Sequence, residues 1–170
     1  IWLALEGDGL EFQAGQYINV QVPGLEQPRA FSIASSPSEP KLLEINVRRA
    51  EGGEATNHLH DKWSIGDELN ITGPLGRFFV RKSFDEPMIF IAGGSGLSSP
   101  KSMILDLLEQ DDKRSITLFY GARSEDELYY AELFDELAAK HENFTYLTAL
   151  SDEPENGDWQ GERVFVHELT

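Results

Sequence analysis

The stretch Met88-Ile-Phe-Ile-Ala-Gly-Gly-Ser-Gly-Leu97 indicates how the second half of the chain folds. Its first five residues are all apolar, which is typical of a strand buried on both faces of a parallel sheet. The glycines that follow form a turn before a predicted helix over residues 100–109, with Ser99 as its N-cap and Pro100 at its first helical position. Glycine lets the backbone approach a diphosphate, and the start of a helix favours the negative charge of such a group.

The residues after this stretch repeat the order of strand and helix. Apolar runs predict strands over residues 116–120 and 144–150, and apolar residues at helical spacing predict a helix over 128–138 between them. Residues 163–166 are predicted to begin a further strand. Together these elements predict an α/β domain with a doubly wound parallel sheet.

The glycine turn taken alone supports more than one interpretation. The dinucleotide-binding fingerprint needs a further glycine three residues after Gly96, and the chain has none there. A tight strand-to-helix connection without a ligand is therefore the alternative. The segment is also not the motif around a hydrolase nucleophile, because Leu97 stands where that motif requires glycine, so hydrolysis loses its best argument.

The first half of the chain has the pattern of short antiparallel strands. Glycine and proline interrupt apolar runs at short intervals, which predicts an antiparallel β-barrel. The predicted strands cover residues 1–5, 16–22, 29–35, 42–49 and 68–72, followed by a short apolar run at 78–80. Turn residues at 83–87 separate the two patterns, so we predict two domains, over residues 1–84 and 85–170.

The composition excludes several classes of function. The chain has 170 residues and a formal net charge of −16, which argues against binding nucleic acids or anionic membrane surfaces. It contains no cysteine, so it can form no disulfide and supply no thiolate to an iron–sulfur cluster. No apolar run is long enough for a membrane span, and we expect a cytoplasmic protein. The acidic surface suits solubility better than a dedicated basic partner.

The segment Arg29-Ala-Phe-Ser32 is the first candidate binding site. Arg29 and Phe31 share one face of a strand, and a guanidinium beside an aromatic plane suits a ligand that has a diphosphate and a flat ring. An edge arginine on an ordinary barrel strand is the alternative. Asn46-Val-Arg48 offers a second cation, and the glycine turn at 52–57 leads into a predicted helix with its N-cap at Thr56 or Asn57, where free N–H groups would bind phosphate.

Four segments in this order resemble the FAD domain of the ferredoxin–NADP reductase superfamily: Arg29-Ala-Phe-Ser32, Asn46-Val-Arg48, Ala55-Thr-Asn-His-Leu59 and Gly73-Pro-Leu-Gly76. The resemblance implies that Arg29 holds the FAD diphosphate, that Phe31 packs on the isoalloxazine where the family usually has tyrosine, and that Ser32 bonds near flavin N5. The FAD-binding residues implied in this way are Arg29, Ala30, Phe31, Ser32, Asn46, Val47, Arg48, Gly53, Ala55 and Thr56.

Ile91-Ala-Gly-Gly-Ser-Gly-Leu97 and Tyr120-Gly-Ala-Arg123 resemble the pyridine-nucleotide motifs of the same superfamily. The resemblance implies a catalytic role for Ser95 beside the nicotinamide and for Ser32 beside the flavin. Arg123 with Ser124 would suit the 2′-phosphate of NADPH, whereas Glu125 or Asp126 would suit the ribose of NADH, which the resemblance favours. The implied nucleotide-binding residues are Gly93, Gly94, Ser95, Gly96, Gly121, Ala122 and Arg123.

Later segments resemble the reductase components of multicomponent phenol and toluene hydroxylases, namely Phe134-Asp-Glu-Leu-Ala-Ala-Lys-His141, Asn143-Phe144 and Trp159-Gln-Gly161. The resemblance implies a plant-type ferredoxin domain with a 2Fe-2S cluster outside this chain and a terminal hydroxylase as the final electron acceptor. We expect the chain to be a fragment whose nucleotide domain is truncated. The alternatives are a FAD reductase that serves a haem partner and a non-catalytic acidic interaction domain.

No metal site is predicted from the sequence. His58 and His60 stand two residues apart, so on a helix they would not face one ligand, and no acidic residue completes a set. We expect these histidines at a helix start or on the surface.

Overall fold

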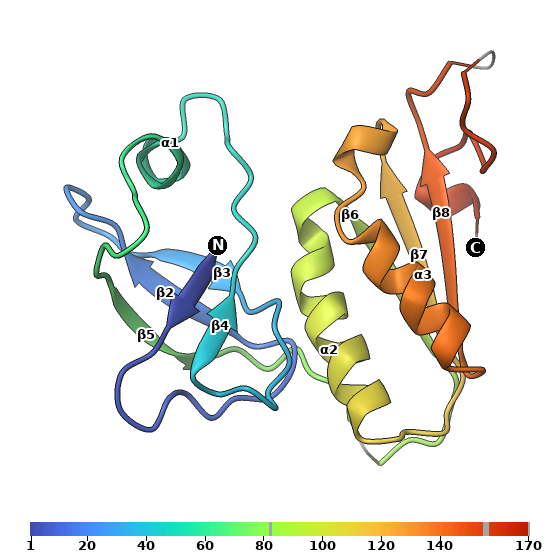
Figure 1. The fold of residues 1–170 in the computed structure, drawn as a ribbon, viewed down its shortest axis with the longest axis horizontal. Coiled ribbons are helices and arrows are strands. Elements are labelled where there is room, and N and C mark those ends of the chain that lie inside the picture. Colours follow the sequence, from blue (N-terminus) through green and yellow to red (C-terminus); the bar gives the residue numbers. More distant parts are fainter. Residues whose placement is uncertain (82, 155–156, 170) are drawn as a thin grey trace.

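The computed structural model describes residues 1–81, 83–154 and 157–169. In the first half, short antiparallel strands form two sheets around a shared apolar core (Figure 1). A bridge between Ile33 and Ile45 joins the sheets. One sheet pairs β1 (Trp2–Ala4) with β4 (Leu42–Glu44), and the other has the order β3 (Arg29–Ser32), β2 (Tyr17–Gln21) and β5 (Asn70–Leu75). The predicted antiparallel arrangement of the first half is confirmed.

Alternating apolar residues along these strands build the core of the first half. Ile18 and Val20 of β2 are fully buried, as is Leu43 of β4. The helix α1 (Glu54–Asp61) packs against this core through Ala55 and Leu59. The core therefore fixes the start of α1 relative to the strands.

In the second half, three parallel strands form a sheet in the order β6 (Met88–Gly93), β7 (Ile116–Ala122) and β8 (Phe144–Leu150). The helix α2 (Ser98–Glu109) connects β6 to β7, and α3 (Ala131–Lys140) connects β7 to β8. Short 3₁₀ turns lie at Gly94–Leu97 (η1), Glu125–Glu127 (η2) and Val166–Glu168 (η3). The predicted parallel α/β arrangement is confirmed. Within the described ranges, no helix is both long and apolar enough to cross a bilayer.

Both helices pack on the same face of the parallel sheet. Ile104 of α2 and Phe134 of α3 are fully buried in one core with Leu118 of β7. On the other face, Ile89 and Ile91 of β6 are 65% and 53% exposed. The prediction of a strand buried on both faces is therefore wrong for β6, because α2 and α3 cover only one face.

Two predicted helix starts also differ from the structure. The helix α1 begins at Glu54 after Gly53, whereas the prediction put its N-cap at Thr56 or Asn57. The helix α2 begins at Ser98, because η1 runs directly into it, so Ser99 is not its N-cap. At α1 the extended Gly53 takes the N-cap position, and at α2 the 3₁₀ turn η1 already has helical backbone before Ser98.

Two predicted strands are shorter in the structure or are missing from it. The strand predicted over residues 42–49 ends at Glu44. The strand predicted at residues 163–166 does not form, since a single bridge between Ala149 and Glu162 precedes η3. The first segment leaves its sheet where it meets the other half of the chain. The second lies at the carboxyl edge of the parallel strands.

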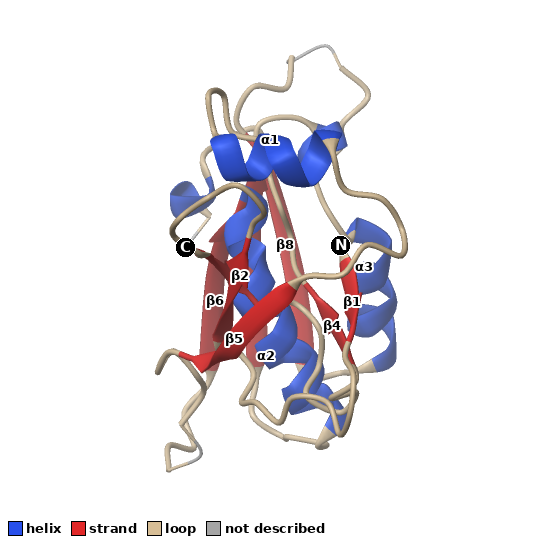
Figure 2. Cartoon of the chain, turned by 90° about the vertical axis from the view of Figure 1, so that its left-hand side faces the viewer, coloured by secondary structure: helices blue, strands red, loops and turns tan. Residues whose placement is uncertain are grey.

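The two halves meet along α2, which lies between the parallel sheet and the first half (Figure 1). Seen from the side of the first half, β5 runs obliquely across the direction of β6 and β8 (Figure 2). Lys101 of α2 forms an ion pair with Glu44 of β4, and both side chains are only 5% exposed. Ser102 Oγ donates a hydrogen bond of 2.6 Å to the carbonyl oxygen of Ser35. Polar contacts therefore join the halves at their buried boundary.

We expect the substitution Lys101→Met to destabilise the protein by about 3–5 kcal/mol, because it leaves the carboxylate of Glu44 buried without its partner. The midpoint of urea unfolding measures this loss. Lys113→Met is the matched control, since the pair of Lys113 with Asp111 is 78% and 80% exposed and should contribute little. Equal shifts for the two variants would contradict the prediction.

Candidate functional site

A cavity of about 520 Å³ opens between β3 and the start of α1. Six of its nine lining residues are among those predicted to bind FAD. The lining consists of Arg29, Ala30, Phe31, Ala50, Gly52, Gly53, Glu54, Ala55 and Thr56. The fold thus gathers an arginine, an aromatic ring and a helix start from separate segments of the chain.

The guanidinium of Arg29 is the cation of this cavity. Its Nη1 donates to the carbonyl oxygens of Gln27, at 2.8 Å, and of Pro28, at 3.4 Å. A guanidinium has five N–H donors, so the donors other than those on Nη1 can serve an anion. Phe31 lies two residues further along β3 and therefore on the same face of the strand.

The glycine at position 53 is required by the shape of the turn before α1. A Cβ at Gly53 would lie 2.6 Å from Thr56 Oγ1 and 2.9 Å from the Cβ of Ala50. Thr56 Oγ1 accepts a hydrogen bond of 3.1 Å from the backbone of Ala50 and donates one of 3.3 Å to the carbonyl oxygen of Gly53. The hydroxyl of Thr56 therefore holds the turn, and the first N–H groups of α1 have no partner inside the helix.

These residues fit FAD. A phosphate group is stabilised by a cation and by the N–H groups at a helix start, and both border the same cavity. The ring of Phe31 gives a flat apolar wall beside them. The cavity therefore offers binding groups for a diphosphate and a flat wall for a planar ring.

Ser32 and Val47 do not line this cavity. Ser32 is the last residue of β3, half-buried and paired in register with Tyr17 of β2. The carbonyl oxygen of Val47 lies 2.9 Å from Nε2 of His60. His60 lies in the last turn of α1 rather than in the first. From there its ring contacts the segment after β4.

The side chain of Asn46 points to the second half of the chain rather than into the cavity. Its Nδ2 donates a hydrogen bond of 3.0 Å to Ser98 Oγ, and its Oδ1 lies 2.5 Å from the hydroxyl of Tyr130. Asn46 therefore contacts residues of the nucleotide half.

Arg48 of the first half lies close to the turn after β6. Its Nη1 is 4.0 Å from the place that a Cβ would take at Gly94. The hydrogen bond from Arg123 and, to a smaller extent, the charge of Arg48 lower the pKa of Glu127. Arg48 is thus a cation that a nucleotide bound at the turn after β6 could meet.

The turn predicted to bind a nucleotide follows β6 at the carboxyl edge of the parallel sheet. Gly94 has a φ of 51°, which glycine adopts without strain. Ser98 Oγ donates a hydrogen bond of 2.9 Å to the carbonyl oxygen of Ser95 and so closes the turn onto α2. A Cβ at Gly96 would meet open space, so a ligand can approach the backbone there.

Gly121, Ala122 and Arg123 lie next to this turn. Gly93 and Gly121 are paired in register on β6 and β7, at the edge where open α/β sheets bind ligands. A Cβ at Gly121 would lie 2.6 Å from the Cβ of Val166, so the packing of η3 also requires glycine there. The structure therefore brings the two predicted nucleotide segments together.

Arg123 is already paired in the structure. Its Nε donates a hydrogen bond of 3.1 Å to Oε2 of Glu127, and a second contact joins Nη2 to Oε1. This hydrogen bonding raises the pKa of Arg123 and lowers that of Glu127. The sequence predicts Glu125 or Asp126 as the acidic residue for the ribose of NADH. In the structure, the acidic residue that pairs with Arg123 is Glu127.

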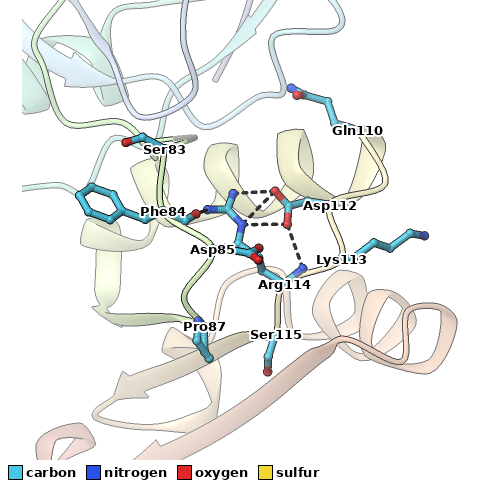
Figure 3. Close-up of a pocket in the computed structure, with 9 residues that line it drawn as sticks. All are labelled: Ser83, Phe84, Asp85, Pro87, Gln110, Asp112, Lys113, Arg114 and Ser115. Atoms are coloured by element: carbon cyan, nitrogen blue, oxygen red, sulfur yellow. Dashed lines mark hydrogen bonds and ion pairs between the residues drawn. The ribbon is translucent and has the colours of Figure 1, made fainter.

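A larger cavity, of about 720 Å³, lies at the opposite edge of the sheet (Figure 3). Two of its charged side chains bind each other, since Arg114 Nη2 lies 2.6 Å from Oδ2 of Asp112. Arg114 Nη1 also donates to the carbonyl oxygen of Phe84 at 2.7 Å. Ligands of parallel sheets bind at the carboxyl edge, so this cavity is not the nucleotide site. Arg114 instead ties the segment before β6 to the second half. In the described part of the chain, no three His, Asp or Glu side chains gather as metal ligands would.

Sequence reasoning missed three residues at the boundary, the buried Glu44 and Lys101 and the partly buried Tyr130. Lys101 lies on an otherwise buried face of α2, and Tyr130 has a φ of 61°, which is uncommon for a residue other than glycine. A lysine within the buried stretch 97–104 is the one signal that could have pointed to this cluster.

Two family models match the chain. The family described as "Oxidoreductase FAD-binding domain" matches residues 2–80, which contain the cavity beside β3. The family described as "Oxidoreductase NAD-binding domain" matches residues 90–170, which contain the glycine turn after β6.

Two relatives are similar over almost the whole chain. The phenol hydroxylase P5 protein of Acinetobacter pittii is 57% identical over 159 residues. The phenol 2-monooxygenase reductase component DmpP of Pseudomonas sp. is 54% identical over 159 residues. Each match covers 94% of this chain and 45% of the relative, so the chain spans less than half the length of these proteins.

The crystal structure of the cytochrome P450 reductase GcoB from Amycolatopsis is also similar. It superposes with a TM-score of 0.90 at 35% sequence identity, over 99% of this chain and 50% of that one. The similarity therefore covers the arrangement of both halves as well as each half alone.

Proposed function

Because the chain belongs to the oxidoreductases in which a FAD-binding domain precedes a NAD-binding domain, we propose that it catalyses hydride transfer from NADH to FAD. In this proposal residues 1–84 bind FAD and residues 85–170 bind the nicotinamide nucleotide. The observation that carries it is the cavity that joins Arg29, Phe31 and the start of α1. A guanidinium, a flat ring and free N–H groups in one cavity match the parts of FAD.

The residues of the FAD side hold and orient the cofactor. FAD, when bound, supplies an isoalloxazine ring that accepts a hydride. Arg29 and the first N–H groups of α1 would bind its diphosphate, and Phe31 would pack on its ring. Ser32, at the end of β3, would donate a hydrogen bond to the ring edge.

The residues of the nucleotide side bring NADH to the same place. The backbone from Gly93 to Gly96 would approach the diphosphate, and the Ser95 hydroxyl would lie beside the nicotinamide. Arg48 adds a positive charge next to Gly94. Hydride transfer requires the reacting atoms to lie about 3–3.5 Å apart, so the contribution of these residues is alignment.

We extend the proposal to the partners of the reaction. The similarity to proteins named as phenol hydroxylase P5 protein and phenol 2-monooxygenase reductase component supports an oxygenase as the final electron acceptor. As the family resemblance of the sequence implies, single electrons would reach it through the 2Fe-2S cluster of a plant-type ferredoxin domain. A haem partner is the second candidate, because GcoB is named a cytochrome P450 reductase. The first candidate is favoured, because the two phenol hydroxylase relatives are 57% and 54% identical to this chain and GcoB is 35% identical. We expect the reaction to take place in the cytoplasm.

Titration of the purified protein with FAD tests the proposal. We expect the protein to bind FAD without a covalent bond and to turn yellow, and we expect NADH to bleach the colour in the absence of oxygen. After gel filtration has removed unbound FAD, the visible absorbance of the protein measures both steps. A protein that elutes colourless after incubation with excess FAD would instead be the non-catalytic interaction domain.

Arg29→Ala should weaken FAD binding by about 10- to 150-fold, which corresponds to the loss of a charged hydrogen bond worth about 1.5–3 kcal/mol. Fluorescence quenching of FAD on binding gives the Kd. Arg49→Ala is the control, because Arg49 pairs with Asp61 at the far end of α1 and both side chains are more than half exposed. Unchanged FAD affinity in Arg29→Ala would rule out this role.

Glu127→Gln should shift the preference from NADH toward NADPH, because it releases Arg123 to bind a 2′-phosphate. We expect the ratio of kcat/KM for NADPH to that for NADH to rise up to about tenfold, the equivalent of one modest ionic contact. Glu132→Gln, on the exposed side of α3, is the control. A ratio that falls or stays constant would show that Arg123 does not select between the two nucleotides.

A further inference from the structure

Three charged or polar residues from three separate elements meet at the buried boundary between the two halves. Glu44 ends β4, Lys101 lies on α2, and Tyr130 precedes α3. The Nζ of Lys101 contacts Oε2 of Glu44, donates to the carbonyl oxygen of Ala34 at 3.2 Å and lies 4.4 Å from the centre of the Tyr130 ring. We call these three residues the boundary cluster.

The hydroxyl of Tyr130 extends the boundary cluster toward Asn46. It lies 2.7 Å from Oε1 of Glu44 and 2.5 Å from Oδ1 of Asn46, so one hydroxyl proton faces two acceptors. Burial and the neighbouring carboxylate of Glu44 raise the pKa of Tyr130, so the hydroxyl stays protonated and remains a donor. The left-handed backbone of Tyr130 persists because these contacts hold its side chain.

Hydrogen bonds connect the boundary cluster to the proposed nucleotide site. Asn46 Nδ2 donates to Ser98 Oγ at 3.0 Å, and Ser98 Oγ donates to the carbonyl oxygen of Ser95 at 2.9 Å. The chain of contacts thus runs from Tyr130 to the turn after β6. Tyr130 also follows directly on the segment 123–129, where Arg123 and Glu127 pair.

The free energy of a buried ion pair indicates that the boundary cluster positions the two halves rather than raising the stability of the protein. A buried ion pair loses the solvation of both charges, and apolar side chains of similar volume often stabilise a protein as well or better. A pair whose members lie on different halves does, however, favour one relative placement, since any shift separates two desolvated charges. Hydride transfer depends on such placement, because the proposed flavin and nicotinamide residues lie on opposite sides of the boundary.

We propose that Glu44, Lys101 and Tyr130 are positioning residues that set the placement of the Gly93–Gly96 turn relative to the flavin side. They hold α2 and the segment before α3 against the end of β4. The inference rests on the proposed function, because placement matters for hydride transfer between the two sides.

Tyr130→Phe tests the inference with the least disturbance, since it removes one hydroxyl and keeps the ring beneath Lys101. Tyr146→Phe is the matched control in the same half, because the hydroxyl of Tyr146 is buried and finds no hydrogen-bond partner among the described residues. The double variant Glu44→Gln with Lys101→Met removes both charges together and so avoids leaving one of them buried alone.

The first measurement is independent of the cofactors. The sequence contains no cysteine, so Lys62→Cys on the flavin half and Glu136→Cys on the nucleotide half can be spin-labelled selectively; both positions are exposed. Electron–electron resonance then gives the distribution of distances between the halves. We expect a single narrow distribution in the unmodified protein and in Tyr146→Phe, and a broader one in Tyr130→Phe and the double variant.

The second measurement follows reduction of the bound flavin by NADH in a stopped-flow instrument without oxygen. We expect Tyr130→Phe to lower the limiting rate at saturating NADH by about tenfold, with little change in the Kd for NADH or FAD, because the cluster aligns the two sides and does not contact either cofactor. Tyr146→Phe should react like the unmodified protein.

The outcomes separate the inference from the proposed function. An unmodified protein that binds no FAD contradicts the proposed function and the inference together. If the unmodified protein is active, two results contradict the inference alone. In the first, Tyr130→Phe and the double variant keep the narrow distance distribution. In the second, the distribution broadens while the limiting rate stays unchanged.

Discussion

The buried ion pair between Glu44 and Lys101 is the interaction on which the rest of the structure depends. Both side chains are 5% exposed, so each charge has exchanged water for a partner that lies on the other half of the chain. Such a pair resists separation, because each charge would then remain buried without compensation. It joins the end of β4 to the start of α2. Asn46 follows β4, and the Gly93–Gly96 turn precedes α2. The contact therefore helps to place the turn after β6 relative to the first half of the chain.

Backbone turns form an important part of both candidate sites. Gly53 precedes α1 because any Cβ there would meet Thr56 and Ala50, and Gly94 has a positive φ at the end of β6. Both turns lead into helices, whose first N–H groups lack partners inside the helix. Side chains add charge to these turns, Arg29 at one and Arg48 at the other. Both candidate sites thus combine an arginine with the free N–H groups of a helix start, which together attract an anionic ligand.

Local patterns predicted much of the fold and several residues that the fold then brings together. The strand at 144–150 has its predicted bounds, because apolar periodicity is a local property, and Arg29, Phe31 and Gly53 do line one cavity. The sequence could not show that Ile89 and Ile91 lie on an uncovered face, because an apolar run looks the same whether one face or two are packed. Lys101 and Tyr130 escaped prediction for another reason: their partner Glu44 is 57 and 86 residues away, and no local pattern records it.

The net charge of −16 sets a further constraint on how the chain can bind its proposed cofactors. FAD and NADH both carry anionic diphosphates, so the field of the whole protein repels them at long range. Salt screens that repulsion over about 8 Å at physiological ionic strength, whereas it screens contacts at hydrogen-bond distance much less. Binding must then depend on the few cations and N–H groups that border each site. An acidic protein can hold two anionic dinucleotides for this reason, provided that Arg29, Arg48 and Arg123 stay where the fold places them.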